Sequence, residues 1–120
     1  MYRFDHLSDE ELIEKLGTVD EVEAAAVTDY LLEKFKTLVR RLSNEFYIIG
    51  GDSNDLLQEG MIGLFKAIRD YSANREATFS TFANICIRRQ LYTAMEASRR
   101  KKHAPLNSYV SLSSDNQEDK

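Results

Sequence analysis

The sequence TFSTFANICIRRQLYTAMEASRRKK occupies residues 78–102 and predicts one long helix. Thr78 is a suitable N-cap, Pro105 ends any continuation, and no Gly or Pro interrupts the residues between them. The helix should therefore run for about six to seven turns. At about 100° per residue, small and aliphatic side chains fall together on one side. This predicted core face consists of Ala83, Ile87, Leu91 and Ala94.

The opposite side of this helix combines large apolar residues near its start with arginines further along. It consists of Phe82, Ile85, Cys86, Arg89, Thr93 and Arg100, flanked by Phe79 and Tyr92. Unstacked bases bind flat apolar surfaces beside cations, at roughly 1–3 kcal/mol per base, so this face suits a nucleic acid. The alternative is that Phe79, Phe82 and Ile85 pack beneath a neighbouring loop or helix. Periodicity alone leaves both interpretations open.

Length and composition limit the class of protein. A chain of 120 residues suits one domain with a modest helical core. One cysteine excludes an internal disulfide, and with the well-separated His6 and His103 it makes no metal-ligand cluster, so we expect no metal or cofactor. No apolar run could span a bilayer, and the charged opening MYRFDHLSDEEL is not a signal peptide. We therefore expect a cytoplasmic protein with no membrane partner.

The net charge of −4 conceals two oppositely charged parts. Residues 1–60 carry six Lys/Arg against fourteen Asp/Glu, whereas residues 61–105 carry nine against three. This division indicates two surfaces for two kinds of partner, a basic protein patch and a polyanion. Ordinary solvated helix faces are the alternative explanation.

Two helices are predicted in the first part of the chain. Ser8 and Glu11 form a capping box that opens a short helix over residues 9–16, closed by Gly17. We expect residues 1–19 to be an accessory segment laid on the bundle. A long helix follows from residue 20 or 21 to about residue 43. Its buried stripe should consist of Val27, Leu31, Phe35, Leu38 and Leu42.

A turn and a third helix come next. Residues 46–51, FYIIGG, should turn the chain, but no Lys-Ser/Thr pair follows the two glycines, so they do not form a nucleotide site. The third helix should cover about residues 53–71, with Asp52 as its cap. Gly60 and Gly63 are costly inside a helix, which indicates close approach of another backbone.

The other side of the third helix has the composition of a protein-protein contact. An apolar anchor within a charged rim is typical of such surfaces. The side consists of Asp55, Gln58, Glu59, Ile62 and Phe65.

The end of the chain is basic and then polar. Four consecutive cations, Arg99 to Lys102, continue the face of Arg89 and predict a stripe that follows phosphates. Residues 106–120 are Ser-rich and polar, which predicts the start of a disordered linker. The whole pattern predicts an all-α fold, a small bundle of three main helices plus a short N-terminal helix.

Three segments together resemble the second domain of bacterial sigma-70-family transcription initiation factors. They are DLLQEGMIGLFKAIRDY (55–71), FSTFANICIRRQL (79–91) and RRKKHAPLNSYVSL (99–112), and the resemblance covers about residues 20–112. Several details, including CIRRQL and the lack of tryptophan, are similar to sigma-H, the alternative factor of spore-forming Firmicutes and their relatives. The resemblance implies a sigma-70 second-domain fold over residues 20–105. It also implies promoter recognition and melting without enzymatic activity, in sporulation or stationary-phase gene expression.

The resemblance also implies roles for particular residues. The third-helix residues Asp55, Gln58, Glu59, Ile62 and Phe65 would contact the clamp helices of the largest subunit of core RNA polymerase. Phe82 would stack on the flipped adenine of the promoter minus-ten element, although it lacks the hydroxyl of the family's usual aromatic. The implied DNA-binding residues are Phe79, Thr81, Phe82, Ile85, Cys86, Arg88, Arg89, Tyr92, Arg99, Arg100, Lys101, Lys102 and His103.

Departures from the family pattern modify these expectations. Ile85 and Cys86 replace the tryptophan pair that wedges the duplex open in housekeeping factors, which implies weaker melting and stricter dependence on promoter sequence. Arg89 and Tyr92 also differ from the housekeeping residues, so the base that they would read stays open. Complete members carry a further minus-thirty-five-binding domain, and we expect this sequence to be a fragment.

Two other functions remain open from the sequence. A generic helical nucleic-acid-binding module would use the basic stripe without sequence preference. A helical interaction protein would instead dock a regulator, such as an anti-sigma factor, on the apolar outer faces.

Overall fold

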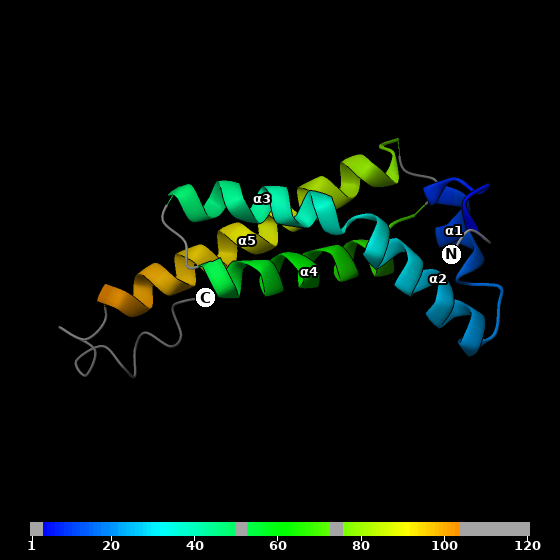
Figure 1. Ribbon diagram of the computed structural model, residues 1–120, viewed down its shortest axis with the longest axis horizontal. Coiled ribbons are helices and arrows are strands. Elements are labelled where there is room, and N and C mark those ends of the chain that lie inside the picture. Colours follow the sequence, from blue (N-terminus) through cyan, green and yellow to red (C-terminus); the bar gives the residue numbers. More distant parts are fainter. Residues whose placement is uncertain (1–3, 50–52, 73–75, 104–120) are drawn as a thin grey trace.

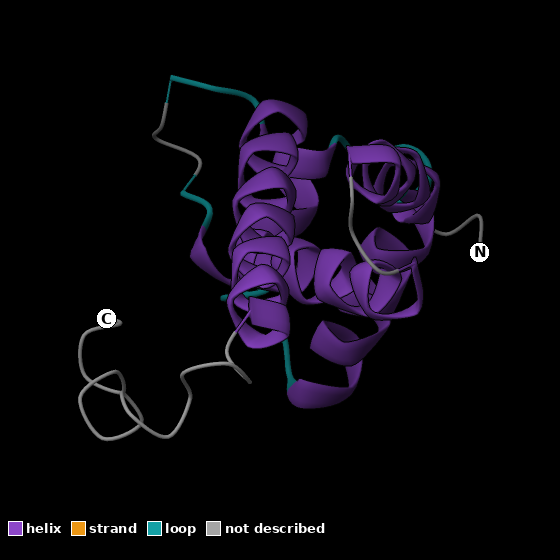
Figure 2. Cartoon of the chain, turned by 90° about the vertical axis from the view of Figure 1, so that its left-hand side faces the viewer, coloured by secondary structure: helices purple, strands orange, loops and turns teal. Residues whose placement is uncertain are grey.

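Helices form all the regular structure of the described residues (Figure 1). The computed structural model describes residues 4–49, 53–72 and 76–103. The helices in chain order are α1 (Asp9–Lys15), α2 (Glu21–Lys34), α3 (Lys36–Ile49), α4 (Ser53–Asp70) and α5 (Phe79–His103). No strand occurs within these ranges, as Figure 2 shows. The predicted all-α bundle is confirmed.

Helices α3, α4 and α5 lie side by side along the molecule and contact one another (Figure 1). Helix α2 meets them at an angle near one end, and α1 lies beyond it. The most extensive contact joins α4 to α5. The two helices with predicted interaction faces therefore pack against each other along much of their length.

Side-chain caps begin three of the helices where the sequence predicts them. Ser8 and Glu11 form the reciprocal capping box of α1, with N···O distances of 3.1 and 2.8 Å. Asp20 accepts a hydrogen bond from the Glu23 N–H at the start of α2. Thr78 accepts one from the Thr81 N–H at 3.2 Å, which confirms it as the N-cap of α5.

The predicted long helix over residues 20–43 is divided in two at Phe35. The backbone there has φ −95° and ψ 8°, outside the α-helical values, and α3 then continues to Ile49 rather than ending near residue 43. The Phe35 ring is buried and packs edge-on against Phe79, with ring centroids 5.3 Å apart. The bend lets both α2 and α3 direct their apolar stripes into one core.

The core confirms most of the predicted buried stripes. In α5, Ala83, Ile87 and Leu91 are completely buried, while Ala94 is half-buried. The buried stripe of α2 and α3 includes Val27, Leu31, Phe35, Val39, Leu42 and Phe46, whereas Leu38 of the predicted stripe is only half-buried. The whole cluster also includes Leu12 and Ile13 of α1, so this short helix is part of the core rather than only laid on it.

Two glycines of α4 allow two different helices to approach. A Cβ added to Gly63 would stand 2.9 Å from Ile87 Cα and 3.1 Å from the Cys86 carbonyl oxygen, both backbone atoms of α5. A Cβ on Gly60 would meet Val39 and Ser43 of α3 at 2.8 and 3.1 Å. The predicted close backbone approach is therefore confirmed at Gly63, whereas Gly60 lies close to side chains of α3.

Polar contacts attach the N-terminal segment to α2. The Lys34 ammonium binds the Asp9 carboxylate at 2.7 Å, and this hydrogen bond raises the pKa of Lys34. The Tyr30 hydroxyl donates to Asp5 at 2.7 Å, which raises the pKa of Tyr30. These contacts hold α1 against the start of the bundle.

Several predictions lie outside the described residues. They concern the Asp52 cap, the Gly50-Gly51 turn, Pro105 and the linker at residues 106–120.

Candidate nucleic-acid and partner interfaces

An aromatic cluster supports the first turns of α5. The Tyr71 ring contacts both Phe79 and Phe82, with centroids 5.5 Å from each, and its hydroxyl donates to the Ala77 carbonyl at 2.7 Å. Phe82 is only partly buried, and its ring packs against Tyr71 at the edge of the core.

Phe79 does not belong to the outer face. The sequence analysis includes it among DNA-binding residues, but its side chain is 0% exposed and packs between Phe35 and Tyr71. It stands four residues before Ala83 and therefore continues the buried stripe of α5. Phe79 is a core residue, and it shares its contact with Tyr71 with Phe82.

The remaining outer residues of the first half of α5 are accessible. Thr81 is exposed, Ile85 is 44% exposed, and Cys86 is half-buried. Together with Phe82 they form a surface of apolar and small side chains. Such a surface could contact unstacked bases, because every base offers an apolar face for stacking.

The cations of α5 differ in their surroundings. Arg88 is held by other side chains, since it donates to Asn84 at 2.8 Å and pairs with Glu45 of α3 at 3.3 Å. Arg99 pairs with Glu96 at 3.3 Å. Arg89 and Arg100 are exposed and form no ion pair with another residue of the described ranges.

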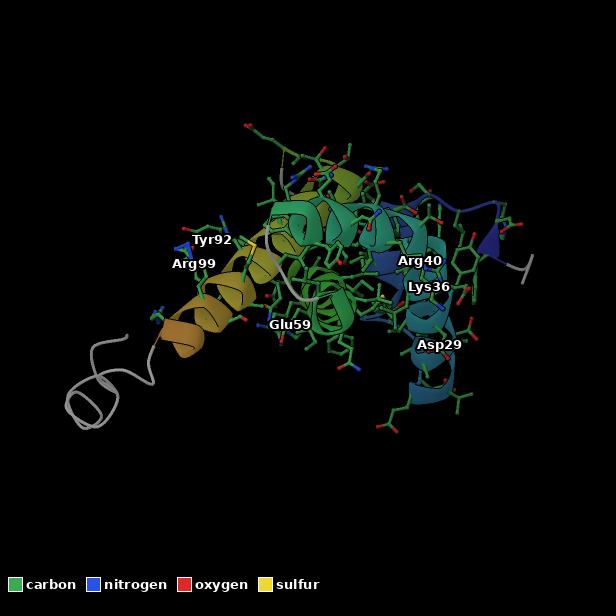
Figure 3. All side chains as sticks on the ribbon, turned by 60° about the vertical axis from the view of Figure 1, so that its left-hand side comes forward. Asp29, Lys36, Arg40, Glu59, Tyr92 and Arg99 are labelled. Atoms are coloured by element: carbon green, nitrogen blue, oxygen red, sulfur yellow. The ribbon has the colours of Figure 1, made fainter. Side chains whose placement is uncertain are left out.

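Tyr92 extends the outer face toward the C-terminal half of α5. Its side chain is 56% exposed, and Figure 3 shows Tyr92 and Arg99 on the same edge of the helix. Lys101, Lys102 and His103 continue the helix, but their side chains lie outside the described part of the structure. The described residues thus follow the predicted order, with apolar groups first and cations later.

The outer side of α4 is apolar at its centre. Ile62 is 43% exposed and Phe65 is 49% exposed, with the exposed Gln58 and the half-buried Glu59 beside them. The Asp55 side chain lies outside the described residues. An open hollow of about 420 Å³ adjoins Phe65 and is lined mainly by Ile13, Leu16, Thr28, Ile68 and Tyr71. This side of α4 could receive an apolar side chain from another protein.

Glu59 is bound to α5 through Gln90, a residue that the sequence analysis does not include. The Gln90 Nε2 donates to Glu59 Oε1 at 2.7 Å, and Gln90 Oε1 accepts from the Lys66 ammonium at 3.0 Å. Sequence periodicity gives no signal for this contact, because it depends on how α4 and α5 are aligned.

Glu10 is a second residue that the sequence analysis does not include. Its Oε2 accepts a hydrogen bond from the Phe79 N–H at 2.7 Å, although it belongs to α1 and lies 69 residues away. A carboxylate at a helix N-terminus satisfies a free N–H and interacts favourably with the helix dipole. Glu10 therefore helps Thr78 to fix the start of α5.

Replacing Glu10 with alanine is expected to lower the free energy of unfolding by about 1–2 kcal/mol, because the Phe79 N–H loses its acceptor. Urea denaturation followed by circular dichroism would measure the change. Glu14→Ala is the matched control, since it removes an equal charge from an exposed position of α1. Equal effects of the two substitutions would contradict a capping role for Glu10.

The described residues contain no group of three or more His, Cys, Asp or Glu side chains that could hold a metal ion. Among the helices of those same ranges, none is long and apolar enough to cross a membrane.

Comparisons with known proteins connect these surfaces to a family. The Sigma-70 region 2 family matches residues 31–101, which include α3, α4 and nearly all of α5. The RNA polymerase sigma-H factors of Bacillus licheniformis and of Bacillus subtilis (strain 168) are each 44% identical to this chain over 110 residues. These alignments cover 92% of this chain and 48% and 49% of the two factors.

A more distant relative is the RNA polymerase sigma-28 factor of Bacillus thuringiensis subsp. kurstaki, which is 32% identical over 78 residues. That alignment covers 65% of this chain and 33% of the relative. No solved structure matches the chain significantly. The chain spans about half the length of the sigma-H factors that it matches. It belongs to the sigma-70 region 2 family, and within that family it is similar to the sigma-H factors.

Proposed function

We propose that this chain acts as a sigma-H-like initiation factor that binds core RNA polymerase through α4 and recognises and melts the promoter minus-ten element through α5. It binds and does not catalyse, because the polymerase itself makes the RNA. Sporulation or stationary-phase genes are the targets that the similarity to sigma-H suggests, and the bacterial cytoplasm is where such a factor would work.

The outer side of α4 is the proposed contact for polymerase. Exposed Ile62 and Phe65 provide an apolar anchor, and Gln58 and Glu59 provide a polar rim. We propose that this side binds the clamp helices of the largest polymerase subunit. An anti-sigma factor could cover the same side and so prevent polymerase from binding.

The outer face of α5 is the proposed contact for promoter DNA. An adenine extruded from the non-template strand would stack on the outward part of Phe82, with Thr81, Ile85 and Cys86 around it. Arg100 and the cations around it would hold the backbone, while Arg88, Arg89 and Tyr92 would lie at the upstream, double-stranded edge. Because Arg88 already pairs with Glu45, it would have to exchange that contact for one with DNA.

The observation that carries the proposal is the arrangement of Phe82. Its ring packs against Tyr71 and is only partly buried, and the exposed Arg89 lies two turns further along the same face. Flipping a base out of the duplex costs a few kcal/mol of free energy. Stacking on the protein and contacts to the DNA backbone must offset this cost. A ring that is held in place before binding contributes more to the binding free energy than a ring that must first be ordered, because less conformational entropy is lost.

Replacing Phe82 with alanine is expected to weaken binding of a non-template minus-ten oligonucleotide by about 5- to 150-fold, the equivalent of roughly 1–3 kcal/mol of stacking. The complex of this chain with core RNA polymerase would be titrated with the labelled oligonucleotide and with a scrambled version. Tyr47→Ala is the control, because it removes a half-exposed ring from α3, a different helix from that of Phe82.

Two results would contradict the proposal. Equal binding of the minus-ten and scrambled oligonucleotides, with a steep dependence on salt, would favour a generic nucleic-acid-binding module. Unchanged affinity of the Phe82→Ala variant, with folding verified by circular dichroism, would remove Phe82 from the base-binding site.

A further inference from the structure

Gln90 of α5 lies across the side of α4 that carries Glu59, Gly63 and Lys66. These three residues occupy successive turns of one helical side, with Gly63 in the middle. A Cβ on Gly63 would stand 3.0 Å from the Gln90 Cβ, so the missing side chain is what lets Gln90 approach. From this place the Gln90 amide reaches Glu59 in one direction and Lys66 in the other.

The side-chain amide suits both neighbours at once. Its NH₂ group donates to the Glu59 carboxylate at 2.7 Å, and its carbonyl oxygen accepts from the Lys66 ammonium at 3.0 Å. Glu59 and Lys66 are seven residues apart, about 10 Å along the helix axis, and they form no direct ion pair. A carboxylate or an ammonium in place of the amide would satisfy one neighbour and repel the other.

We propose that Gln90 is a positioning residue that holds the Glu59 carboxylate in the orientation that RNA polymerase binds. This inference rests on the proposed function, in which Glu59 contacts polymerase. The hydrogen bond uses Oε1 of Glu59, and in this proposal Oε2 binds a cation of the partner. Fixing the side chain before binding reduces the conformational entropy that association would otherwise lose.

The proposal also gives the DNA-facing helix a part in polymerase binding. Gln90 is half-buried and belongs to α5, next to the exposed Arg89. The residue therefore connects the proposed polymerase side of α4 to the helix that carries the proposed DNA face. Lys66 takes part indirectly, because its bond to Gln90 Oε1 fixes which end of the amide points at Glu59.

The test is the affinity of the whole chain for core RNA polymerase, measured for Gln90→Leu and for the control Asn84→Leu. Asn84 is a half-buried amide of the same helix, but its bond is to Arg88 within α5 and not to α4. Gln90→Leu is expected to weaken binding by about 3- to 10-fold, and Asn84→Leu to leave it unchanged. If Gln90→Leu fails to fold, Lys66→Met tests the same arrangement and should weaken binding by a smaller factor.

A double-mutant cycle with Glu59→Gln identifies the route of the effect. If Gln90 acts through the Glu59 charge, Gln90→Leu should add little in the Glu59→Gln background. A full 3- to 10-fold loss in that background, or no loss in the native background, would overturn the inference. If instead the proposed function itself is wrong, Glu59→Gln alone would leave the affinity for polymerase unchanged. This outcome is distinct from the two that overturn the role of Gln90.

Discussion

Replacing Gly63 with valine is expected to lower the free energy of unfolding by about 3 kcal/mol, a large part of the roughly 5–15 kcal/mol that stabilises a small domain. The new Cβ would stand 2.9 Å from Ile87 Cα and 3.1 Å from the Cys86 carbonyl oxygen. Both are backbone atoms of α5, so the contact cannot be relieved by rotating a side chain. Helix α5 would have to move away from α4 along their main contact.

Urea denaturation followed by circular dichroism would measure this change, with two other glycines for comparison. A Cβ at Gly17 would meet only the Glu14 carbonyl oxygen at 3.9 Å, so Gly17→Val should have little effect. Gly60→Ala should lie between the two, because the atoms that it meets, Val39 Cγ1 and Ser43 Oγ, belong to side chains that can shift. A Gly63→Val protein as stable as Gly17→Val would show that the α4–α5 crossing is looser than the structure describes.

The fold could be predicted from sequence where the signal is local or periodic. The caps formed by Ser8 and Thr78 depend on residues three positions away, and the buried stripe of Ala83, Ile87 and Leu91 repeats every four residues. The bend at Phe35 could not be predicted in this way. No Gly or Pro marks it, and it results from the packing of the Phe35 ring against Phe79 of a distant helix.

The candidate interfaces were harder to predict because they depend on the alignment of separate helices. Phe79 has the aromatic character of the outer face, yet its position one turn before Ala83 and the nearby Tyr71 place it in the core. Gln90 and Glu10 have no distinctive pattern in the sequence. Their importance follows from contacts with residues 31 and 69 positions away.

Reversing the charge of Glu59 with arginine is expected to weaken binding to core RNA polymerase by at least about 100-fold. Close charge pairs in protein interfaces contribute roughly 1.5–7 kcal/mol, and 1.4 kcal/mol is a tenfold change in affinity. The substitution replaces attraction with repulsion and also removes the acceptor that Gln90 binds. The fold should survive, since Glu59 is only half-buried.

Pull-down and titration with purified core polymerase would measure this loss, with Glu33→Arg as the control. Glu33 is an exposed carboxylate of α2, so its reversal makes an equal change in net charge on a helix outside the proposed contact. Binding of random duplex DNA should remain in both variants, because the cations of α5 are untouched. If Glu59→Arg binds polymerase as well as Glu33→Arg does, the outer side of α4 is not the polymerase contact. The exposed Ile62 and Phe65 would then have to serve another partner, and an anti-sigma-type regulator would become the better candidate.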